Sequence, residues 1–281
     1  MPELPELEVV REVLDRRLLG RPIRQVTLAP KGSPLVVRDL TARGFAATLT
    51  GEAFARVERR GKFLAFTLQP SELYLVVNPK LTGRLQLCAP GEKKAGPVHL
   101  VLHFDKPPTE LRYVDSKTMG QVYLTDRLEA IPTFADMGPD ALAVSLDDFR
   151  TRLRSFRGEI KGILIRAPFV AGIGNAYADE ILWHARMHPY RKRTSLTPAE
   201  VVQLFDSMGS VLRAAIEQVR LQMGDDVHLK PRDFFAVHLR SGEACPRCST
   251  PVSAITANQR ITNFCRACQP GGLLRGMGSP P

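Results

Sequence analysis

The sequence lacks a run of about 18 apolar residues, which is the length that a helix needs to cross a bilayer. It also lacks a recognisable secretory signal, because its first residues, Met1-Pro2-Glu3-Leu4-Pro5-Glu6, are acidic where a signal would be basic and then apolar. Cysteine is scarce, with five residues in 281. We therefore expect a soluble cytoplasmic protein that has no contact with membranes and no disulfide framework.

The remaining composition is that of a globular protein with a basic excess. Hydrophobic residues make up 44% and charged residues 24%, and the length suffices for two domains. The net charge is +10, of which residues 151–281 contribute +8, with 18 basic against 10 acidic side chains. Clustered Lys and Arg attract phosphates, so a polyanionic partner is one interpretation. A basic but merely solvated surface is the other.

Hydrophobic periodicity predicts a helix at the N-terminus, with apolar residues at helical spacing from Leu7 to Leu18 and Gly20 after them. From about residue 23 to 124 apolar residues alternate in short blocks, such as 25–28, 63–68 and 98–104. Gly and Pro separate these blocks, which is typical of a β-sandwich or barrel.

The pattern changes around residues 132–148. Helices are predicted for 142–157 and 198–219, with Ser145 and Thr197 as N-caps. We therefore predict an N-terminal β domain and a helical domain, then a cysteine-bearing segment and a disordered Gly/Pro tail. The predicted bounds are 1–135, 136–240, 241–269 and 270–281.

Four of the five cysteines form one pattern. Cys245-Pro246-Arg247-Cys248 is followed by sixteen residues and then by Cys265-Arg266-Ala267-Cys268. Two such CxxC pairs can place four thiolates tetrahedrally around zinc. Four thiolates leave no open coordination position, so we expect one structural zinc ion. Cys88 lies outside the pattern and is interpreted as a small buried residue.

Two further segments have the chemistry to bind phosphate. Residues 258–262, between the cysteine pairs, are turn-like and flanked by strand formers, which would place Arg260 at the tip of a hairpin. Gly172-Ile173-Gly174-Asn175 precedes a helical segment, where Asn175 can cap and free N–H groups can bind an anion. An ordinary surface arginine and an ordinary glycine turn remain the alternatives.

The N-terminus combines an imino acid with two carboxylates. Glu3 and Glu6 are three residues apart beside Pro2, and so share one face of the predicted helix start. Acidic residues also occur there simply because they favour the helix dipole. If Met1 is removed, however, Pro2 becomes a secondary amine that can attack a sugar C1′ and form an iminium ion, with a carboxylic acid to move protons.

Taken together, these segments resemble the formamidopyrimidine-DNA glycosylase and endonuclease VIII family, from Pro2 to Gln269. The matching stretches are 2–6, Arg60-Gly61-Lys62, 171–175 with 177–180, and the four-cysteine segment. The resemblance implies an α+β fold: an N-terminal helix on a β-sandwich, then a helical domain with a helix-two-turns-helix motif and a C-terminal four-cysteine zinc finger. It also implies damaged double-stranded DNA as the partner, a monomer, and the bacterial cytoplasm or nucleoid as the location.

The same resemblance implies a bifunctional DNA glycosylase and AP lyase of base excision repair. Pro2 would form the Schiff base, Glu3 would act as the acid in sugar opening and later proton transfers, and Glu6 would support them. The bases removed would be formamidopyrimidines, 8-oxoguanine or oxidised pyrimidines, and the strand would be cut by β,δ-elimination.

Further DNA contacts are implied by matching position. Lys62 would bind phosphate near the lesion and aid β-elimination, while Arg260 would grip the flanking phosphate and aid δ-elimination. Lys161 and Asn175 would be additional phosphate contacts.

The chain departs from the formamidopyrimidine branch in the residues that fill the gap left by the rotated nucleotide. Leu81 stands where that branch has Met before Thr-Gly, and Lys117 and Met119 stand in place of an Arg and a Phe. Lys is a point charge rather than a bidentate donor. The segment 221–230 is also short for a loop that would cover 8-oxoguanine, which favours an endonuclease VIII-like or divergent specificity.

Two other functions stay open from the sequence. One is a catalytically idle relative that binds damaged DNA, or a monofunctional glycosylase with divergent lesion specificity. The other is a zinc-ribbon protein that binds nucleic acid or ribosomes without chemistry, which leaves the proline and carboxylates of the N-terminus unexplained.

Overall fold

The computed structural model describes residues 1–30, 33–257 and 260–271. Two compact units make up the chain: unit 1 comprises Met1–Asp136 and Ala215–Pro231, and unit 2 comprises Met137–Ala214 and Arg232–Pro281. Asn258 and Gln259 of the predicted hairpin turn, and the predicted disordered tail from residue 272 onward, lie outside the described residues.

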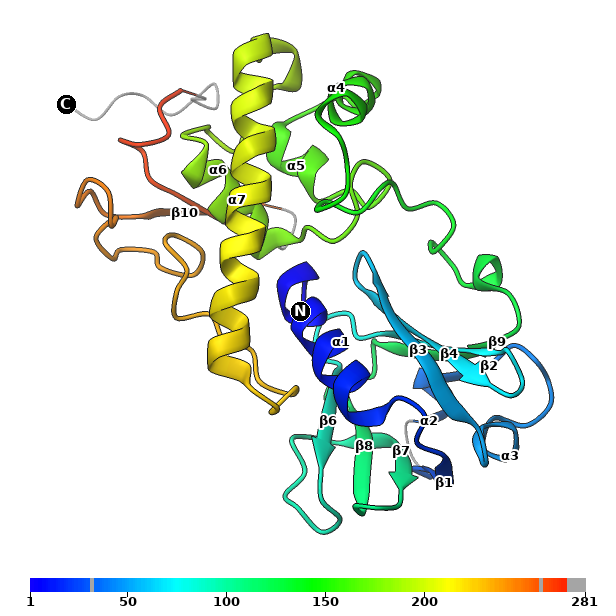
Figure 1. Ribbon diagram of the computed structural model, residues 1–281. Coiled ribbons are helices and arrows are strands. Elements are labelled where there is room, and N and C mark those ends of the chain that lie inside the picture. The colour runs from blue at the N-terminus through cyan, green and yellow to red at the C-terminus, as the bar shows by residue number, and fades with distance from the viewer. Residues whose placement is uncertain (31–32, 258–259, 272–281) are drawn as a thin grey trace. The chain divides into compact units, whose positions relative to one another are not determined.

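Unit 1 begins with the predicted helix, α1 (Leu4–Leu18) (Figure 1). One face of α1 is buried, and its apolar residues follow the helical spacing seen in the sequence. Glu6 lies in the first turn and Arg16 and Arg17 in the last, which suits the helix dipole at both ends. The helix packs against β3 and β4.

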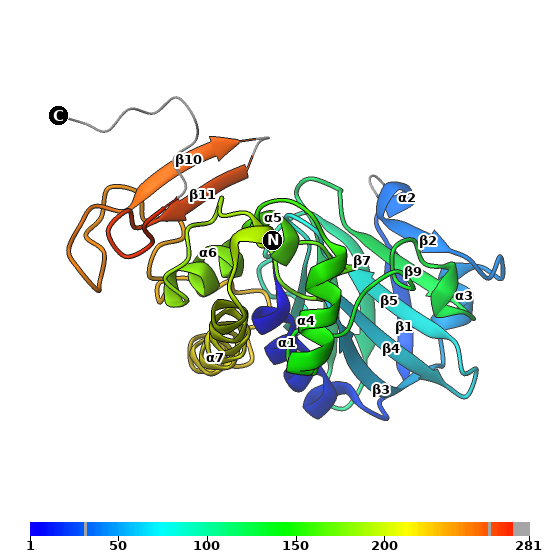
Figure 2. The ribbon, with the colours of Figure 1, turned by 90° about the horizontal axis from the view of Figure 1, so that it is seen from above.

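Two sheets form the rest of unit 1, as the sequence predicts for a β-sandwich (Figure 2). One sheet has the order β1 (Ile23–Leu28), β7 (Val98–Phe104), β8 (Thr109–Val114), β6 (Arg84–Cys88). The other has the order β2 (Val37–Asp39), β9 (Gln121–Thr125), β5 (Tyr74–Asn78), β4 (Phe63–Gln69), β3 (Ala53–Arg60). In the second sheet, the ring centroids of Phe54 on β3 and Phe66 on β4 are 4.6 Å apart. The Phe54 centroid also lies 5.9 Å from that of Phe104 on β7 of the first sheet. These centroid distances show that the sheets pack face to face around an aromatic core.

Short helices and a distant segment complete unit 1. The helices are α2 (Ser33–Val36), α3 (Phe45–Leu49) and the 3₁₀ turn η1 (Leu128–Ala130). Residues 215–231 include the end of the long helix α7 (Pro198–Met223). They are tied to α1 by the Arg220 guanidinium, which donates to both carboxylate oxygens of Glu12 at 2.9 Å.

Unit 2 is mainly helical. It contains α4 (Leu146–Ser155), α5 (Ile160–Leu164), α6 (Asn175–His184), η2 (Arg193–Ser195) and the first part of α7. The predicted caps are confirmed: Ser145 Oγ accepts from the Asp148 N–H, and Thr197 exchanges hydrogen bonds with Glu200 before α7. None of the helices in the described part of the chain is long and apolar enough to cross a membrane.

The cysteine-bearing segment of unit 2 carries one antiparallel hairpin, β10 (Ser253–Ala257) and β11 (Arg260–Phe264). The register pairs Ala257 with Arg260 and Ser253 with Phe264. The hairpin packs on α6 through β11, which brings the chain's last strand against the helix that follows the glycine turn.

Candidate functional site

The N-terminal carboxylates are fixed by the start of α1. Glu3 is the N-cap, and its N–H donates to Glu6 Oε2 at 2.8 Å in the reciprocal arrangement of a capping box. Only 2% of Glu3 and 1% of Glu6 is exposed, so both carboxylates are held in one place. Pro2 is buried next to them and, with Glu6, lines a pocket of unit 1. The predicted grouping of these three residues is what the structure has.

Lys62 lies in the turn between β3 and β4, where Gly61 has a φ of +57°. The turn is joined to α1 by Arg59, which sequence reasoning missed. Its Nε donates to Glu8 at 2.6 Å and its Nη1 donates to the Gly61 carbonyl at 3.1 Å. Since Glu8 is one helical turn beyond the N-terminus of α1, this bridge sets the position of the Lys62 turn relative to the helix.

Leu81, Lys117 and Met119 come from two loops that Asp115 holds together. The Thr82 hydroxyl and the backbone N–H groups of Lys117 and Gly120 donate to the Asp115 carboxylate. Burial raises the pKa of Asp115, but these hydrogen bonds outweigh it and leave the pKa below its usual value. Leu81 and Met119 are 44% and 45% exposed, and Lys117 is exposed. The structure therefore presents these three predicted contact residues to solvent from linked loops.

Glycine is required in both loops because the Tyr113 hydroxyl lies between them. A Cβ added at Gly120 would be 1.8 Å from that oxygen, and one at Gly83 would be 2.1 Å from it. The Gly83 position is tighter still, because its Cβ would also meet the Pro79 carbonyl oxygen at 2.4 Å. The loops can therefore close over Tyr113 only without side chains at these two positions.

The four predicted zinc ligands converge. The Sγ atoms of Cys245, Cys248, Cys265 and Cys268 all lie within 4.8 Å of one another. Tetrahedral zinc with bonds of about 2.3 Å places its sulfur ligands about 3.8 Å apart, and the Cys245–Cys268 and Cys248–Cys265 pairs are separated by 3.9 and 3.4 Å. The residues fit one structural zinc ion. Cys88 is far from them in sequence and is buried, as predicted, and burial raises its pKa to about 11.

The finger is docked on α6 by a tryptophan and an arginine. Trp183 Nε1 donates to Cys245 Sγ at 3.4 Å, and the Arg247 guanidinium stacks 4.0 Å from the centre of the Trp183 ring. The buried Gln269 closes the finger: its side chain accepts from the Cys265 N–H and donates to the Met187 carbonyl.

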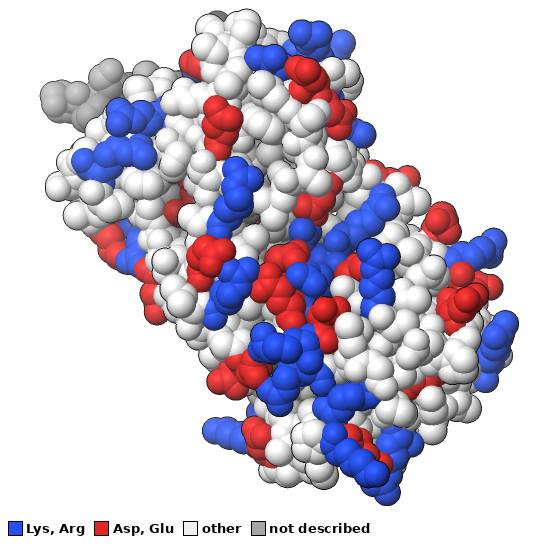
Figure 3. Space-filling model, in the orientation of Figure 1, with Lys and Arg blue, Asp and Glu red and all other residues white. Residues whose placement is uncertain are grey.

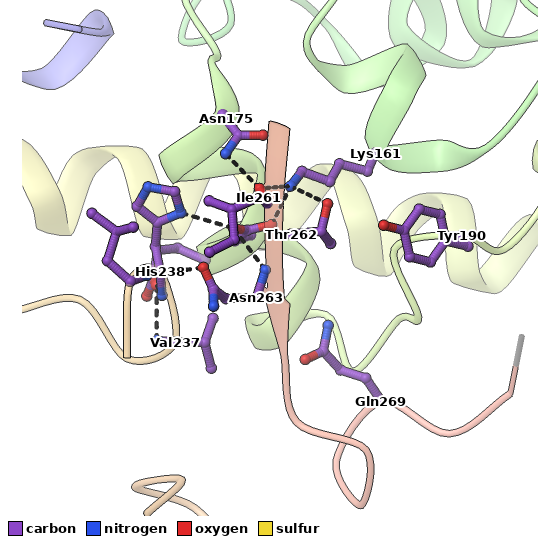
Figure 4. Close-up of polar contacts among 12 residues, drawn as sticks. Lys161, Asn175, Tyr190, Val237, His238, Ile261, Thr262, Asn263 and Gln269 are labelled. Atoms are coloured by element: carbon purple, nitrogen blue, oxygen red, sulfur yellow. Dashed lines mark hydrogen bonds and ion pairs between the residues drawn. The ribbon is translucent and has the colours of Figure 1, made fainter. Parts of the chain in front are cut away.

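A buried polar network joins α5, α6 and β11 (Figure 4). Asp179 is central: its carboxylate lies 2.6 Å from Lys161 Nζ and 2.8 Å from His238 Nδ1, and it accepts from the Asn263 N–H at 3.1 Å. Lys161 also donates to the Thr262 hydroxyl at 2.8 Å. Because Lys161 is 5% exposed and its ammonium is committed to these groups, its placement argues against a direct phosphate contact. Asp179 and Glu180 belong to the stretch 177–180 that carries the resemblance, but the sequence alone assigned them no role.

Glu180 fastens the neighbouring segment to α6. Its carboxylate accepts from the backbone N–H groups of Ala236, Val237 and His238 at 2.8 to 3.0 Å. Burial raises the pKa of Glu180 above its usual value, against the three donors that lower it.

Asn175 begins α6 as predicted, but it is not the cap. Gly174 is the N-cap residue, and the Asn175 amide instead donates to the Ile261 carbonyl of β11 at 2.8 Å (Figure 4). The correction has a physical reason: β11 packs against the start of α6 and supplies an acceptor there. Arg260 is the first residue of β11 and is exposed, so the N-terminus of α6 and Arg260 belong to one packed assembly of unit 2.

The charged side chains are mixed in sign. On the face shown in Figure 3, Lys and Arg side chains have Asp and Glu neighbours rather than one uninterrupted basic patch. Ion pairs account for part of this pattern, such as those of Arg16 and Arg17 with Asp225 and of Arg220 with Glu217. Net charge by itself therefore does not locate a binding surface.

Comparison with known protein families matches three parts of the chain. Residues 1–122 match the formamidopyrimidine-DNA glycosylase N-terminal domain, residues 137–224 its H2TH domain, and residues 242–271 a zinc finger found in FPG and IleRS. The predicted helix-two-turns-helix motif and zinc finger are thereby confirmed.

Curated relatives and solved structures agree with these matches. The formamidopyrimidine-DNA glycosylases of Symbiobacterium thermophilum and Herpetosiphon aurantiacus are 38% and 35% identical, over 96% of this chain and 90% and 100% of theirs. The Lactococcus lactis Fpg, solved with abasic-site DNA, has a TM-score of 0.83 at 28% identity, covering 96% of this chain and 100% of that one. The same protein has also been solved with Fapy-dG-containing DNA, with a TM-score of 0.82. The chain therefore belongs to the formamidopyrimidine-DNA glycosylase family.

Proposed function

We propose that this protein is a bifunctional DNA glycosylase and AP lyase of base excision repair in the bacterial cytoplasm. It binds damaged double-stranded DNA, removes an oxidised base and cuts the strand by β,δ-elimination. The observation that carries the proposal is the buried Glu3–Glu6 capping box, which holds a proline at the second position of the chain on the wall of a pocket.

The chemistry starts with the Pro2 nitrogen once Met1 has been removed, because the lone pair of an acylated nitrogen is delocalised into the carbonyl group. The amine forms a bond to C1′, the bond from C1′ to the base breaks, and the base leaves with a proton. Glu3 protonates the ring oxygen as the sugar opens, which leaves an iminium ion between Pro2 and C1′. Glu6 holds the Glu3 backbone in place through its hydrogen bond.

Strand cutting follows from the iminium ion, which acidifies the neighbouring C–H bonds of the sugar. Loss of a C2′ proton expels the 3′ phosphate, and a second elimination expels the 5′ phosphate. Lys62 binds phosphate near the lesion in the first elimination, and Arg260 grips the flanking phosphate in the second. Asn175 contributes through the N-terminus of α6, while Lys161 positions β11 from inside the protein.

Leu81, Met119 and Lys117 fill the gap left by the rotated nucleotide. Two half-exposed apolar side chains on linked loops suit insertion into a base stack, where rotating a base out costs roughly a few kcal/mol. Lys117 offers a point charge to the orphaned base and not a planar fork, so we expect weaker discrimination of the opposite base than an arginine would give.

Borohydride trapping on an abasic-site duplex tests the proposal. The protein without Met1 is expected to form a covalent adduct. Pro2→Gly is expected to lose the adduct or to form much less of it, while Glu3→Gln forms it more slowly. Glu12→Gln, on the same helix but outside the site, serves as the matched control. A correctly processed protein that binds this duplex without forming an adduct would instead be a catalytically idle or monofunctional relative.

A further inference from the structure

A pocket that the proposed chemistry does not use lies within unit 2, between α4 and the beginning of α7. Phe149 of α4 packs against Phe205 of α7 with ring centroids 5.5 Å apart, so the two helices lie side by side (Figure 1). The pocket has a volume of about 170 Å³. It shares no residue with the zinc cluster or with the buried network around Asp179.

Three arginines converge on this pocket from two segments. Arg150 and Arg154 belong to α4, and Arg193 is the first residue of η2. Arg150 lies 3.5 Å from the carboxylate of Asp147, whose side chain is 93% exposed. The Arg193 Nε donates to the Phe156 carbonyl at 3.2 Å. Among the described residues, Arg154 has neither an ion-pair nor a hydrogen-bond partner.

The pocket wall holds no acidic side chain of the described residues. Two nearby carboxylates are bound to other arginines: Asp148 accepts from Arg152 at 3.2 Å, and Glu200 accepts from Arg191 at 2.9 Å. Like charges repel, and one exposed ion pair compensates them only weakly. A bound anion would relieve this repulsion, and the planar fork of an arginine matches a carboxylate with two parallel hydrogen bonds.

The rest of the pocket is apolar, with Leu153, Leu196, Pro198 and Val201 in its wall. An apolar cavity of about 150 Å³ holds one benzene molecule, so this pocket has room for an aromatic or aliphatic side chain. Inorganic phosphate would leave the apolar residues in contact with water, and a DNA duplex is too wide to enter. The ligand that matches both parts of the wall carries an apolar group next to a carboxylate.

We propose that this pocket is a docking site for the acidic C-terminal end of a partner protein. A terminal phenylalanine or leucine has an apolar side chain and a carboxylate on the same residue, as the wall requires, and preceding acidic residues would face Arg150 and Arg154. Residues 270–281 of this chain contain no acidic residue, so its own C-terminal end does not supply those charges.

Fluorescence anisotropy with the full chain tests the site. The probe is a labelled peptide of several aspartates that ends in leucine and phenylalanine. Two companion peptides carry alanine in place of the phenylalanine, or an amide in place of the terminal carboxylate. The protein variants are Arg154→Ala, and Arg150→Ala combined with Arg154→Ala. Arg166→Ala is the matched control, because it removes the same charge from an exposed position of unit 2 outside the pocket.

Three further measurements accompany the peptide titrations. Dissociation constants for an abasic-site duplex show whether the variants affect DNA binding. Sedimentation velocity shows whether a second copy of the chain occupies the pocket. Thermal unfolding verifies that each variant is folded.

We expect the peptide to bind about 10-fold more weakly to Arg154→Ala, as for loss of hydrogen bonds to a charged group, and more weakly still to the double variant. Arg166→Ala should bind it as wild type does. The alanine peptide should lose about 10-fold because it buries no aromatic ring, and the amidated peptide should also bind more weakly. Binding to the abasic-site duplex should stay unchanged in the pocket variants.

Equal losses in Arg154→Ala and Arg166→Ala would show a general effect of charge and overturn the inference. Equal affinity for the phenylalanine and alanine peptides, or displacement of the peptide by an equal concentration of inorganic phosphate, would reduce the pocket to a simple anion site. Weaker binding of Arg154→Ala to the abasic-site duplex would place the pocket in the DNA interface instead. Self-association that Arg154→Ala abolishes would assign it to a second copy of the chain.

Discussion

The start of α1 and the zinc finger are both candidate contact regions, but different forces hold them in place. Glu3 and Glu6 lie at the end of a helix that packs on a two-sheet core, so apolar burial supports them. Among the described residues, the finger contributes Cys245, Val252 and Cys265 to a small apolar cluster with Val237. It depends on metal ligands and on buried polar bonds to α6. The start of α1, where we propose the covalent chemistry, should therefore survive perturbations that disable the finger, for which we propose phosphate binding.

Loss of the zinc site should produce the largest difference between the two regions, by disabling the finger and leaving the start of α1 folded. Structural zinc contributes roughly 10–16 kcal/mol of apparent binding free energy in zinc-finger peptides, which the small cluster around Cys265 cannot replace. We expect Cys265→Ser to weaken DNA binding more than about 100-fold, measured by fluorescence anisotropy, while the β-rich unit keeps its circular dichroism. Cys88→Ser is the control outside the cluster. Unfolding of the β-rich unit in Cys265→Ser would contradict the view that the two regions are stabilised independently.

Breaking the buried ion pair should have the next largest effect. Asp179→Ala leaves the Lys161 ammonium buried without its carboxylate, which costs roughly 3–5 kcal/mol. Replacing both residues, as in Lys161→Met with Asp179→Leu, should restore much of the stability, because apolar replacement of a buried pair is often neutral. Denaturant unfolding measures both. A double variant no more stable than Asp179→Ala would show that the hydrogen bonds to β11 matter more than the charges.

In the loops of unit 1 that contain Gly83 and Gly120, stability should depend on side-chain volume and not on charge. Gly120→Ala places a methyl against the Tyr113 hydroxyl and should destabilise by roughly 1–3 kcal/mol. Tyr113→Phe removes that oxygen and should rescue part of the loss. The same rescue should fail for Gly83→Ala, whose Cβ also meets the Pro79 carbonyl. Thermal unfolding of Gly120→Ala and of Gly83→Ala, each with and without Tyr113→Phe, measures the rescue. Equal rescue at both positions would contradict this account of the packing.

The smallest effect is expected at the surface of unit 1. Asp225 pairs with Arg16 and Arg17, all three largely exposed to solvent. Exposed pairs contribute about 0–1 kcal/mol and are screened by salt, so Asp225→Asn should change the unfolding free energy by no more than that, and less at high salt. A loss of several kcal/mol would mean that the segment after α7 is held to α1 mainly by charge.

Much of the architecture could be predicted because it follows from local pattern. Alternation marked β4 and β7, helical spacing marked α1, and hydroxyl side chains marked the starts of α4 and α7. The zinc ligands could be predicted because metal geometry constrains the spacing of the cysteines in the sequence.

The supporting residues could not be predicted, because their roles depend on contacts between segments far apart in the chain. Arg59 and Asp115 join separate turns, and Asp179 meets Lys161, His238 and Asn263 only after folding. Asn175 was misjudged as a cap for the same reason, since the acceptor for its amide belongs to β11. Likewise, α7 is one continuous helix, so nothing local indicates that residues 215–231 group with unit 1.

Locating the covalent bond tests the Pro2 chemistry most directly. Protein without Met1 is reduced with borohydride on an abasic-site duplex, digested, and the modified peptide is sequenced by mass spectrometry. The reduced sugar is predicted on the nitrogen of Pro2, in the peptide that begins Pro2-Glu3-Leu4. Attachment to a lysine such as Lys62, with the Pro2 peptide unmodified, would contradict the mechanism.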